Sequence, residues 1–132
     1  MSTSTARARR TAMATLWLAI APLAWSPAQA ADAIVVGRSL VLSGPLQSYG
    51  EAKRDGGDAY IHKVNAAVGV RGRPIELVTL DDVYAPANTV ANLRKLAAEK
   101  QPTAFLGLFG VPTVAAALPV LAELKIPAVG LT

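Results

Sequence analysis

The sequence predicts an α/β protein whose parallel β-sheet is doubly wound, with helices on both faces. Short apolar runs alternate along the chain with longer segments in which apolar residues recur at every third or fourth position. Continuous apolar runs are typical of strands buried on both faces, and the longer period is typical of amphipathic helices. Strands and helices in regular alternation form right-handed crossovers, which build a parallel sheet.

The first strand is predicted at residues 33–42, where most residues are apolar. A Ser-Gly-Pro turn at residues 43–45 ends it, because glycine and proline favour turn conformations. The first helix is predicted at residues 47–66. Its apolar stripe, which is expected to face the sheet, consists of Gly57, Tyr60, Ile61 and Val64.

The rest of the chain continues the same alternation. Strands are predicted at residues 74–82, 103–108 and 126–131, and helices at residues 86–100 and 112–124. Pro86 fits the first position of its helix, whereas Pro119 lacks an N–H group and is expected to kink the third helix. Because no helix follows the fourth strand, we expect a chain truncated after about four strands, the first part of a longer protein.

Residues 1–30 have the features of a secretory signal peptide. An apolar stretch at residues 12–25 follows a positive region and precedes Ala28-Gln29-Ala30, a cleavage pattern of small residues. The positive residues are Arg7, Arg9 and Arg10. The adjacent arginine pair leaves a twin-arginine route open, although the residues after it give that route little support. Residues 31–132 are expected to form the exported domain.

Charge and cysteine content exclude several classes of function. The formal net charge is +4, but three of the thirteen basic residues lie in the signal peptide, which leaves ten against nine acidic residues. Since no basic run or aromatic platform follows residue 31, we expect no nucleic-acid partner. The sequence has no cysteine, which excludes disulfides, thiolate metal sites and the lipid-attachment cysteine of an exported lipoprotein.

The common catalytic patterns are missing from the sequence. It contains no G-x-G-x-x-G, no G-x-x-x-x-G-K-[ST] and no G-x-S-x-G. His62, the only histidine, lies mid-helix among charged residues and is expected at the surface. Asp81 and Asp82 end a strand and are interpreted as a solvated turn pair, or as a cap for the next segment, in preference to a metal or phospho-acceptor site. We therefore expect no catalytic residue, no metal and no cofactor, and a binding protein instead of an enzyme.

Several short patterns occupy distinctive places in the predicted fold. They are Ser43-Gly44-Pro45, Tyr49-Gly50, Gly56, Asn65, Gly69-Val70-Arg71-Gly72 and Asp81-Asp82. Together with an export signal, they resemble the N-terminal lobe of a periplasmic solute-binding protein. The subgroup is the type I fold of the branched-chain amino acid (leucine/isoleucine/valine) ABC-transport family. The resemblance covers residues 34–132 and depends on the combination of these patterns.

This resemblance implies that the chain is a Rossmann-like half of a two-lobed protein, with the second lobe absent from the sequence. In that family two α/β lobes joined by a hinge close around a small ligand, such as an amino acid. The loaded protein then delivers the ligand to the membrane permease of an ABC transporter. The resemblance further implies a soluble protein of the periplasm that is a monomer when full length.

Five residues are candidate ligand contacts because of the resemblance. Tyr49 would face the cleft, and a loop with Gly110, Val111 and Thr113 would present backbone N–H groups to a carboxylate. Thr132 lies at the start of the loop after the fourth strand. Amino-acid binders of the family often have a hydroxyl residue where this chain has Val111, so an aromatic acid, an amide or another small solute stays open as the ligand. Tyr49 packing on the rim of the sheet and Thr113 capping the third helix also stay open.

Two further interpretations remain beside the transport protein. One is a ligand-sensing module of the same fold that regulates a partner protein. The other is a small exported flavodoxin-like enzyme, which would need a bound cofactor. Tyr84, which follows the acidic pair, is interpreted as a surface turn residue.

The signal peptide gives the first testable prediction. Cleavage after Ala30 should leave Ala31 as the N-terminus of the exported protein, because small residues lie at both recognition positions of the cleavage pattern. N-terminal sequencing of the protein recovered from the periplasmic fraction checks this. An intact Met1 terminus on exported protein would contradict it.

Overall fold

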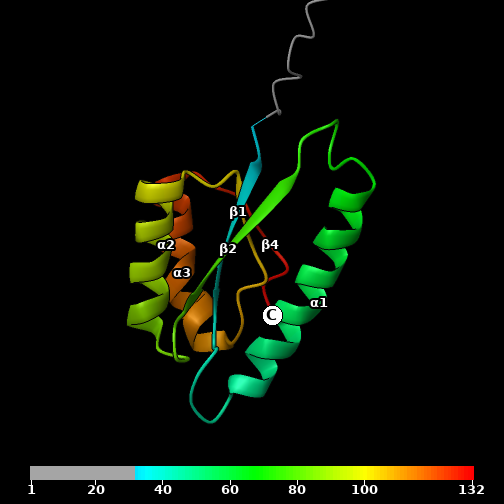
Figure 1. Ribbon diagram of the computed structural model, residues 1–132. Coiled ribbons are helices and arrows are strands. Elements are labelled where there is room, and N and C mark those ends of the chain that lie inside the picture. Colours follow the sequence, from blue (N-terminus) through cyan, green and yellow to red (C-terminus); the bar gives the residue numbers. More distant parts are fainter. Residues whose placement is uncertain (1–31) are drawn as a thin grey trace, which may run out of the picture.

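The computed structural model describes residues 32–132, so the signal peptide predicted at residues 1–30 lies outside the described residues. Strands and helices alternate as the sequence predicts, and the doubly wound α/β fold is confirmed (Figure 1). In chain order the elements are β1 (Ile34–Leu40), α1 (Gln47–Ala66), β2 (Ile75–Asp81), α2 (Pro86–Lys100), β3 (Ala104–Leu106), α3 (Val111–Leu124) and β4 (Ala128–Val129). Within the described range, no helix combines the length and the apolar composition that a bilayer span requires.

The four strands form one parallel sheet in the order β2-β1-β3-β4. The chain moves outward from β1 to β2 and then crosses back over β1 to reach β3. The crossovers on the two sides of β1 therefore lie on opposite faces: α1 covers one face, and α2 and α3 pack together on the other (Figure 1). Such a reversal is a topological switch point, and ligands of open α/β sheets bind beside it, at the carboxyl ends of the strands.

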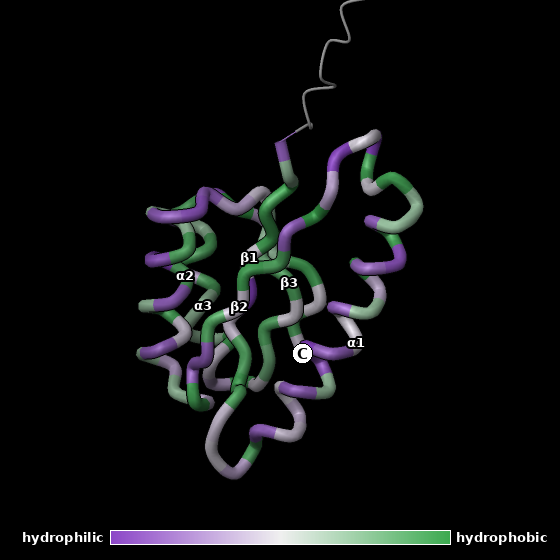
Figure 2. The backbone as a smooth tube through the Cα atoms, in the orientation of Figure 1, coloured by the Kyte–Doolittle hydropathy of each residue, from purple (hydrophilic) through white to green (hydrophobic). Residues whose placement is uncertain are grey.

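The apolar core lies on the face covered by α2 and α3. Its buried members are Leu93, Leu96, Phe105, Leu108, Ala117, Val120 and Leu121. Phe105 fills space that the neighbouring strand leaves open at Gly37, since a methyl group added there would lie 2.8 Å from the Phe105 ring. Figure 2 shows the contrast with α1, which is mostly hydrophilic or intermediate along its length, whereas the strands are largely hydrophobic.

The face beneath α1 is held by an arginine. Arg38 is 3% exposed, and its Nε donates to Thr79 Oγ1 at 2.9 Å. Its terminal nitrogens donate to the backbone oxygen of Arg54 at 3.3 Å and to the Asp58 carboxylate at 2.5 Å. Gly57 allows this approach, because an added methyl group would lie 2.8 Å from the guanidinium. A buried charge of this kind is tolerated because its hydrogen bonds and the carboxylate replace water.

The expected apolar stripe of α1 is partly wrong. Gly57, Ile61 and Val64 are half-buried, but Tyr60 is 65% exposed. Tyr60 lies at the edge of the stripe, about 60° from Gly57 at 100° per residue. The sheet thus buries only the centre of the stripe, where Arg38 lies against Gly57.

All four strands are shorter than predicted, and β3 and β4 keep half of their predicted length or less. β3 stops at Leu106 and β4 at Val129, and each is followed by a glycine with positive φ: 71° at Gly107 and 70° at Gly130. Left-handed backbone cannot continue a strand, so both strands end at the same level of the sheet. α3 begins one residue earlier than predicted, at Val111, and continues through Pro119 to Leu124, while the expected kink stays a prediction.

The close fit at Gly37 gives the second prediction. Gly37→Ala should lower the free energy of unfolding by about 1–3 kcal/mol, because the added methyl group overpacks against the Phe105 ring. Gly56→Ala is the matched control: it lies within α1 with nothing within 4 Å of the added methyl group, and it should raise stability by up to about 1 kcal/mol. Urea unfolding of both full-length variants measures the two effects. Equal behaviour of the two variants would contradict the packing at Gly37.

Candidate ligand-binding site

The loops that follow the four strands meet at one edge of the sheet, because parallel strands all end there. The predicted contact residues all lie in these loops or in the first turns of the helices that they enter. The edge is therefore assembled from chain segments far apart in sequence.

Three aromatic side chains form the centre of this edge. Phe109 stacks against Tyr49, with ring centroids 5.7 Å apart and planes 12° apart. Tyr84 approaches Phe109 from another loop, with centroids 6.0 Å apart at a tilt of 47°. Tyr49 is nevertheless 57% exposed, so its ring both packs on the rim and presents a free surface. We call Tyr49, Tyr84 and Phe109 the aromatic cluster.

A glycine brings Tyr49 to this position. Gly50 is buried in the first turn of α1 and lies against the backbone carbonyl of Val41; an added methyl group would overlap that carbonyl. The Tyr-Gly pair thus places the tyrosine at the entrance of α1, beside the end of β1. Lys53, one turn further along, extends over Phe109 with its ammonium 5.6 Å from the ring centroid, within reach of a cation–π interaction.

The start of α3 supplies backbone donors. Neither the N–H of Val111 nor that of Thr113 has a hydrogen-bond partner within residues 32–132, whereas the Gly110 N–H donates to Thr132 O at 2.6 Å. Val111 is 81% exposed. Thr113 is fully buried, and its hydroxyl contacts the carbonyl oxygens of Phe109 and Gly110.

Thr113 therefore offers a ligand no free hydroxyl, and its N–H is enclosed with the rest of the residue, whereas the N–H of the exposed Val111 has no partner in the described part of the chain. The N-cap of α3 is Gly110, and no side chain caps the helix. Thr132 extends this edge, with its N–H donating to Leu108 O at 3.1 Å.

Asp81 connects two loops of the edge. Its Oδ1 accepts hydrogen bonds from the N–H groups of Leu42 at 2.8 Å and Val83 at 2.9 Å, and its Oδ2 accepts one from the Ser43 hydroxyl at 2.5 Å. Asp81 is exposed, and its partial desolvation alone would raise the pKa of this carboxyl, but the hydrogen bonds from Ser43, Leu42 and Val83 outweigh that effect and hold the pKa below its usual value.

The interpretation of a solvated turn pair holds for Asp81, which is exposed, and is wrong for Asp82. Asp82 is 1% exposed, and its Oδ2 accepts hydrogen bonds from the hydroxyls of Ser39 at 2.9 Å and Thr89 at 3.0 Å. Its Oδ1 accepts one from the Tyr84 N–H at 3.0 Å. The alternative of a cap for the next segment is confirmed, since Asp81 and Asp82 accept hydrogen bonds from the N–H groups of Val83 and Tyr84, although no side chain caps α2 itself. The Asp82 carboxylate also joins β1, the loop after β2 and the first turn of α2.

Neither the Tyr84 ring nor the Phe109 ring was selected from the sequence, although Phe109 begins the loop that was expected to face the ligand; the structure brings both rings together at this edge. Tyr84 was expected to be a surface turn residue, but it is half-buried and its ring lies against Gly110. The available signal was an aromatic residue just after a predicted strand end, at the edge where ligands of this fold bind. His62 is exposed as expected, and residues 32–132 contain no group of three potential metal-ligating side chains.

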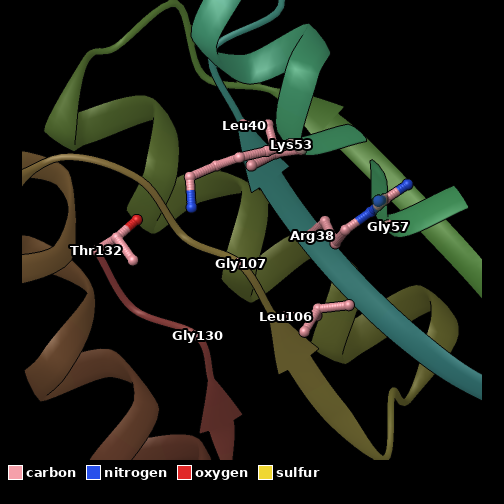
Figure 3. A pocket seen from close by; sticks show the side chains of 8 residues that line it. All are labelled: Arg38, Leu40, Lys53, Gly57, Leu106, Gly107, Gly130 and Thr132. Carbon is pink, nitrogen blue, oxygen red and sulfur yellow. The ribbon is translucent and has the colours of Figure 1, made fainter. Parts of the chain in front are cut away.

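A cavity of about 240 Å³ lies between α1 and the ends of β1, β3 and β4 (Figure 3). Its lining consists of Arg38, Leu40, Lys53, Gly57, Leu106, Gly107, Gly130 and Thr132. Figure 3 shows the Lys53 ammonium directed toward Thr132, and the Arg38 guanidinium turned toward Gly57. No carboxylate lines the cavity, and Lys53 forms no ion pair within the described part of the chain.

Comparison with known proteins agrees with this architecture. The family model of the periplasmic binding proteins matches residues 33–132, and the chain belongs to that family. The leucine-, isoleucine-, valine-, threonine- and alanine-binding protein of Pseudomonas aeruginosa is 37% identical over 79 residues, which are 60% of this chain and 21% of that protein.

Two solved structures show the same likeness. A possible leucine/isoleucine/valine-binding protein from Rhodopirellula baltica is 32% identical with a TM-score of 0.72, over 79% of this chain and 28% of the other. An ABC-transporter solute-binding protein from R. palustris, in complex with 4-hydroxybenzoate, is 31% identical with a TM-score of 0.65, over 74% of this chain and 26% of the other. The chain thus spans about a quarter of the length of these relatives.

The hydrogen bonds to Asp81 give the third prediction. A pKa that is lower in the folded state means that the charged carboxylate favours folding. This contribution is complete above about pH 4, the ordinary value for aspartate, and is lost as the pH falls through the lowered folded-state value.

Asp81→Asn should lower the free energy of unfolding at pH 7 by about 1 kcal/mol, since the group is partly solvated. The difference from wild type should shrink below pH 4. Thermal unfolding of the full-length proteins between pH 3 and pH 7 measures it. Asp55→Asn, at an exposed position paired only with neighbouring Arg54, is the control for loss of one charge. A pH-independent difference for Asp81→Asn would contradict the assignment.

Proposed function

We propose that the chain is part of the substrate-binding component of an ABC importer for amino acids of the branched-chain type or a related small carboxylated solute. The observation that carries the proposal is the backbone N–H of the exposed Val111, which has no partner among the described residues and lies at the start of α3, beside the aromatic cluster at the switch point of the sheet. The names of the relatives support the same class of ligand.

The physical chemistry of this edge suits a carboxylate bound without reaction. The N-terminus of a helix carries about half a positive charge together with N–H groups that the helix itself does not use. The Lys53 ammonium adds a positive charge near Phe109 and Thr132. The exposed ring surface of Tyr49 offers apolar area and a hydroxyl for the remainder of the ligand. Under this proposal the protein is not an enzyme and requires no cofactor.

The partners and location follow from the same proposal. The signal peptide at residues 1–30 would direct the protein to the periplasm, where a second lobe would close over the edge described above. A membrane permease would receive the ligand. The full-length protein would act as a monomer, because closure of its own lobes completes the site.

An aromatic carboxylic acid is the second candidate ligand, and the aromatic cluster favours it. The Tyr49 and Phe109 rings are nearly parallel and stacked, and the exposed side of Tyr49 is free to stack on another ring. The Val111 side chain cannot donate a hydrogen bond to a carboxylate. A serine or threonine at this position could, so the edge has one side-chain donor fewer for the carboxylate of an amino acid. The R. palustris relative in complex with 4-hydroxybenzoate shows that the family includes a protein with such a ligand.

The fourth prediction tests the binding function. The protein is expressed from its own gene, with whatever its reading frame encodes after Thr132, and titrated by calorimetry with leucine, isoleucine, valine and 4-hydroxybenzoate. Wild type should bind at least one of them. Tyr49→Ala should weaken that binding about tenfold, because ring contact with the ligand and with Phe109 is lost.

Tyr60→Ala is the matched control. Tyr60 is an exposed tyrosine of the same helix, and it is absent from the contacts of the edge. Its replacement should leave the affinity unchanged. Equal affinities of the Tyr49→Ala variant and wild type would remove Tyr49 from the site, and no binding by wild type to any of the four compounds would count against the proposed ligand class.

A further inference from the structure

The loop between β2 and α2 has an unusual backbone. Val83 and Tyr84 are consecutive non-glycine residues with positive φ, 52° and 60°. Side chains disfavour this left-handed conformation, so two in succession require outside support. The support is visible: the Val83 N–H donates to Asp81 Oδ1, and the Tyr84 N–H donates to Asp82 Oδ1.

This backbone directs the Tyr84 ring onto Gly110. A methyl group added to Gly110 would lie 2.8 Å from the Tyr84 hydroxyl oxygen, and nearer still to the ring carbon Cε2. Gly110 is buried, has a φ of 98° and immediately precedes α3. The ring therefore lies directly against Gly110, the N-cap of α3, and the next residue, Val111, carries an N–H without a partner within the described range.

We propose that Tyr84 is a positioning residue for ligand binding: its ring holds Gly110, and so places the Val111 N–H at the start of α3 where a ligand carboxylate meets it. The inference rests on the proposed function. Tyr84 acts through Gly110, and its own hydroxyl need not contact the ligand.

A continuous series of contacts supports this role. Ser39 belongs to the central strand of the sheet and donates to Asp82, which accepts from the N–H of Tyr84. The Tyr84 ring then lies on Gly110. Asp82 is fixed a second time by Thr89 of α2. These contacts thus link the N-terminus of α3 to β1 in the middle of the sheet.

The other contacts of Gly110 do not fix its position against the β2–α2 loop. Its N–H donates to Thr132 and its carbonyl accepts from Val114 and Thr113, all of which belong to α3 or to the segment after β4. The Tyr84 ring supplies the contact from the opposite side. Ordering donors before the ligand arrives raises affinity, because binding then loses less conformational entropy.

A double-mutant cycle on the full-length protein tests the inference, with the ligand of wild type identified among leucine, isoleucine, valine and 4-hydroxybenzoate. Tyr84→Phe keeps the ring and should retain the affinity within about twofold. Tyr84→Ala removes the ring and should weaken binding about tenfold. Gly110→Ala should also weaken binding, because its methyl group collides with the ring and because positive φ disfavours alanine.

Combining Tyr84→Ala with Gly110→Ala should cost less affinity than the product of the two single losses, since the collision is gone. Gly72→Ala is the control for backbone strain alone: φ is 81° there, and nothing lies within 4 Å of an added methyl group. It should leave the affinity unchanged, even where it lowers the melting temperature.

A spectroscopic readout separates positioning from general stability. In NMR spectra of the ligand-free protein, the Gly110 α-protons should show a ring-current shift that persists in Tyr84→Phe and disappears in Tyr84→Ala. Backbone motion at Val111, measured by ¹⁵N relaxation, should increase only in the variant without the ring.

The outcomes distinguish the two proposals. Wild type that binds a ligand, with Tyr84→Ala binding equally well, overturns the positioning role and leaves the proposed function standing. Independent losses in the double variant, equal to the product of the single losses, also overturn the positioning role. Wild type that binds none of the four compounds counts against the proposed function, and the inference falls with it. Loss on Tyr84→Ala, rescue by Tyr84→Phe and coupling to Gly110 together support it.

Discussion

The buried carboxylate of Asp82 is the contact on which the carboxyl edge of this sheet depends. Its two oxygens take hydrogen bonds from the central strand, from α2 and from the loop that joins β2 to α2. A carboxylate that is removed from water without such donors would be strongly unfavourable, so donors and acceptor require one another. Because the donors come from separate segments, satisfying this one group also sets where those segments lie.

The two faces of the sheet are stabilised in different ways. Toward α2 and α3 the contacts are apolar and closely fitted, with Phe105 at the centre of the cluster. Toward α1 a buried arginine bonds to a neighbouring strand and to the helix above it. Apolar packing gains from every methylene removed from water, whereas a buried arginine is stable only while its particular partners are present. The position of α1 therefore depends on a few directional bonds, and Tyr49 and Lys53 are carried on that helix.

Local signals were enough to predict most of the fold. The bounds of α1 and α2 agree with the sequence prediction, because their periodicity is regular and the turn residues around them act locally. The ends of β3 and β4 were not predictable in the same way, since a glycine within an apolar run does not reveal that its φ is positive. Tyr60 was misplaced because periodicity alone does not tell how wide a part of the apolar stripe the sheet covers.

Less of the candidate site could be predicted, because its contacts join residues that lie far apart in the sequence. The position of the tyrosine after the Ser-Gly-Pro turn could be anticipated, and the structure places Tyr49, Gly110, Val111, Thr113 and Thr132 at one edge, although their contacts with a ligand remain predictions. The burial of Asp82 could not be anticipated, because its partner Ser39 lies 43 residues earlier in the chain. The contact of the Tyr84 ring with Gly110 could not be anticipated either, because Gly110 lies in the loop after β3, in a distant part of the sequence.

The pairing of Gly37 with Phe105 has an evolutionary consequence. The Phe105 ring of β3 occupies the space that a side chain at Gly37 of β1 would need, so only one of the two positions can carry a large side chain. Drift at either position alone is opposed, whereas a compensated exchange, with a larger residue at 37 and a smaller one at 105, preserves the packing density of the core. The unit on which selection acts at the centre of this sheet is thus a pair of residues from two strands.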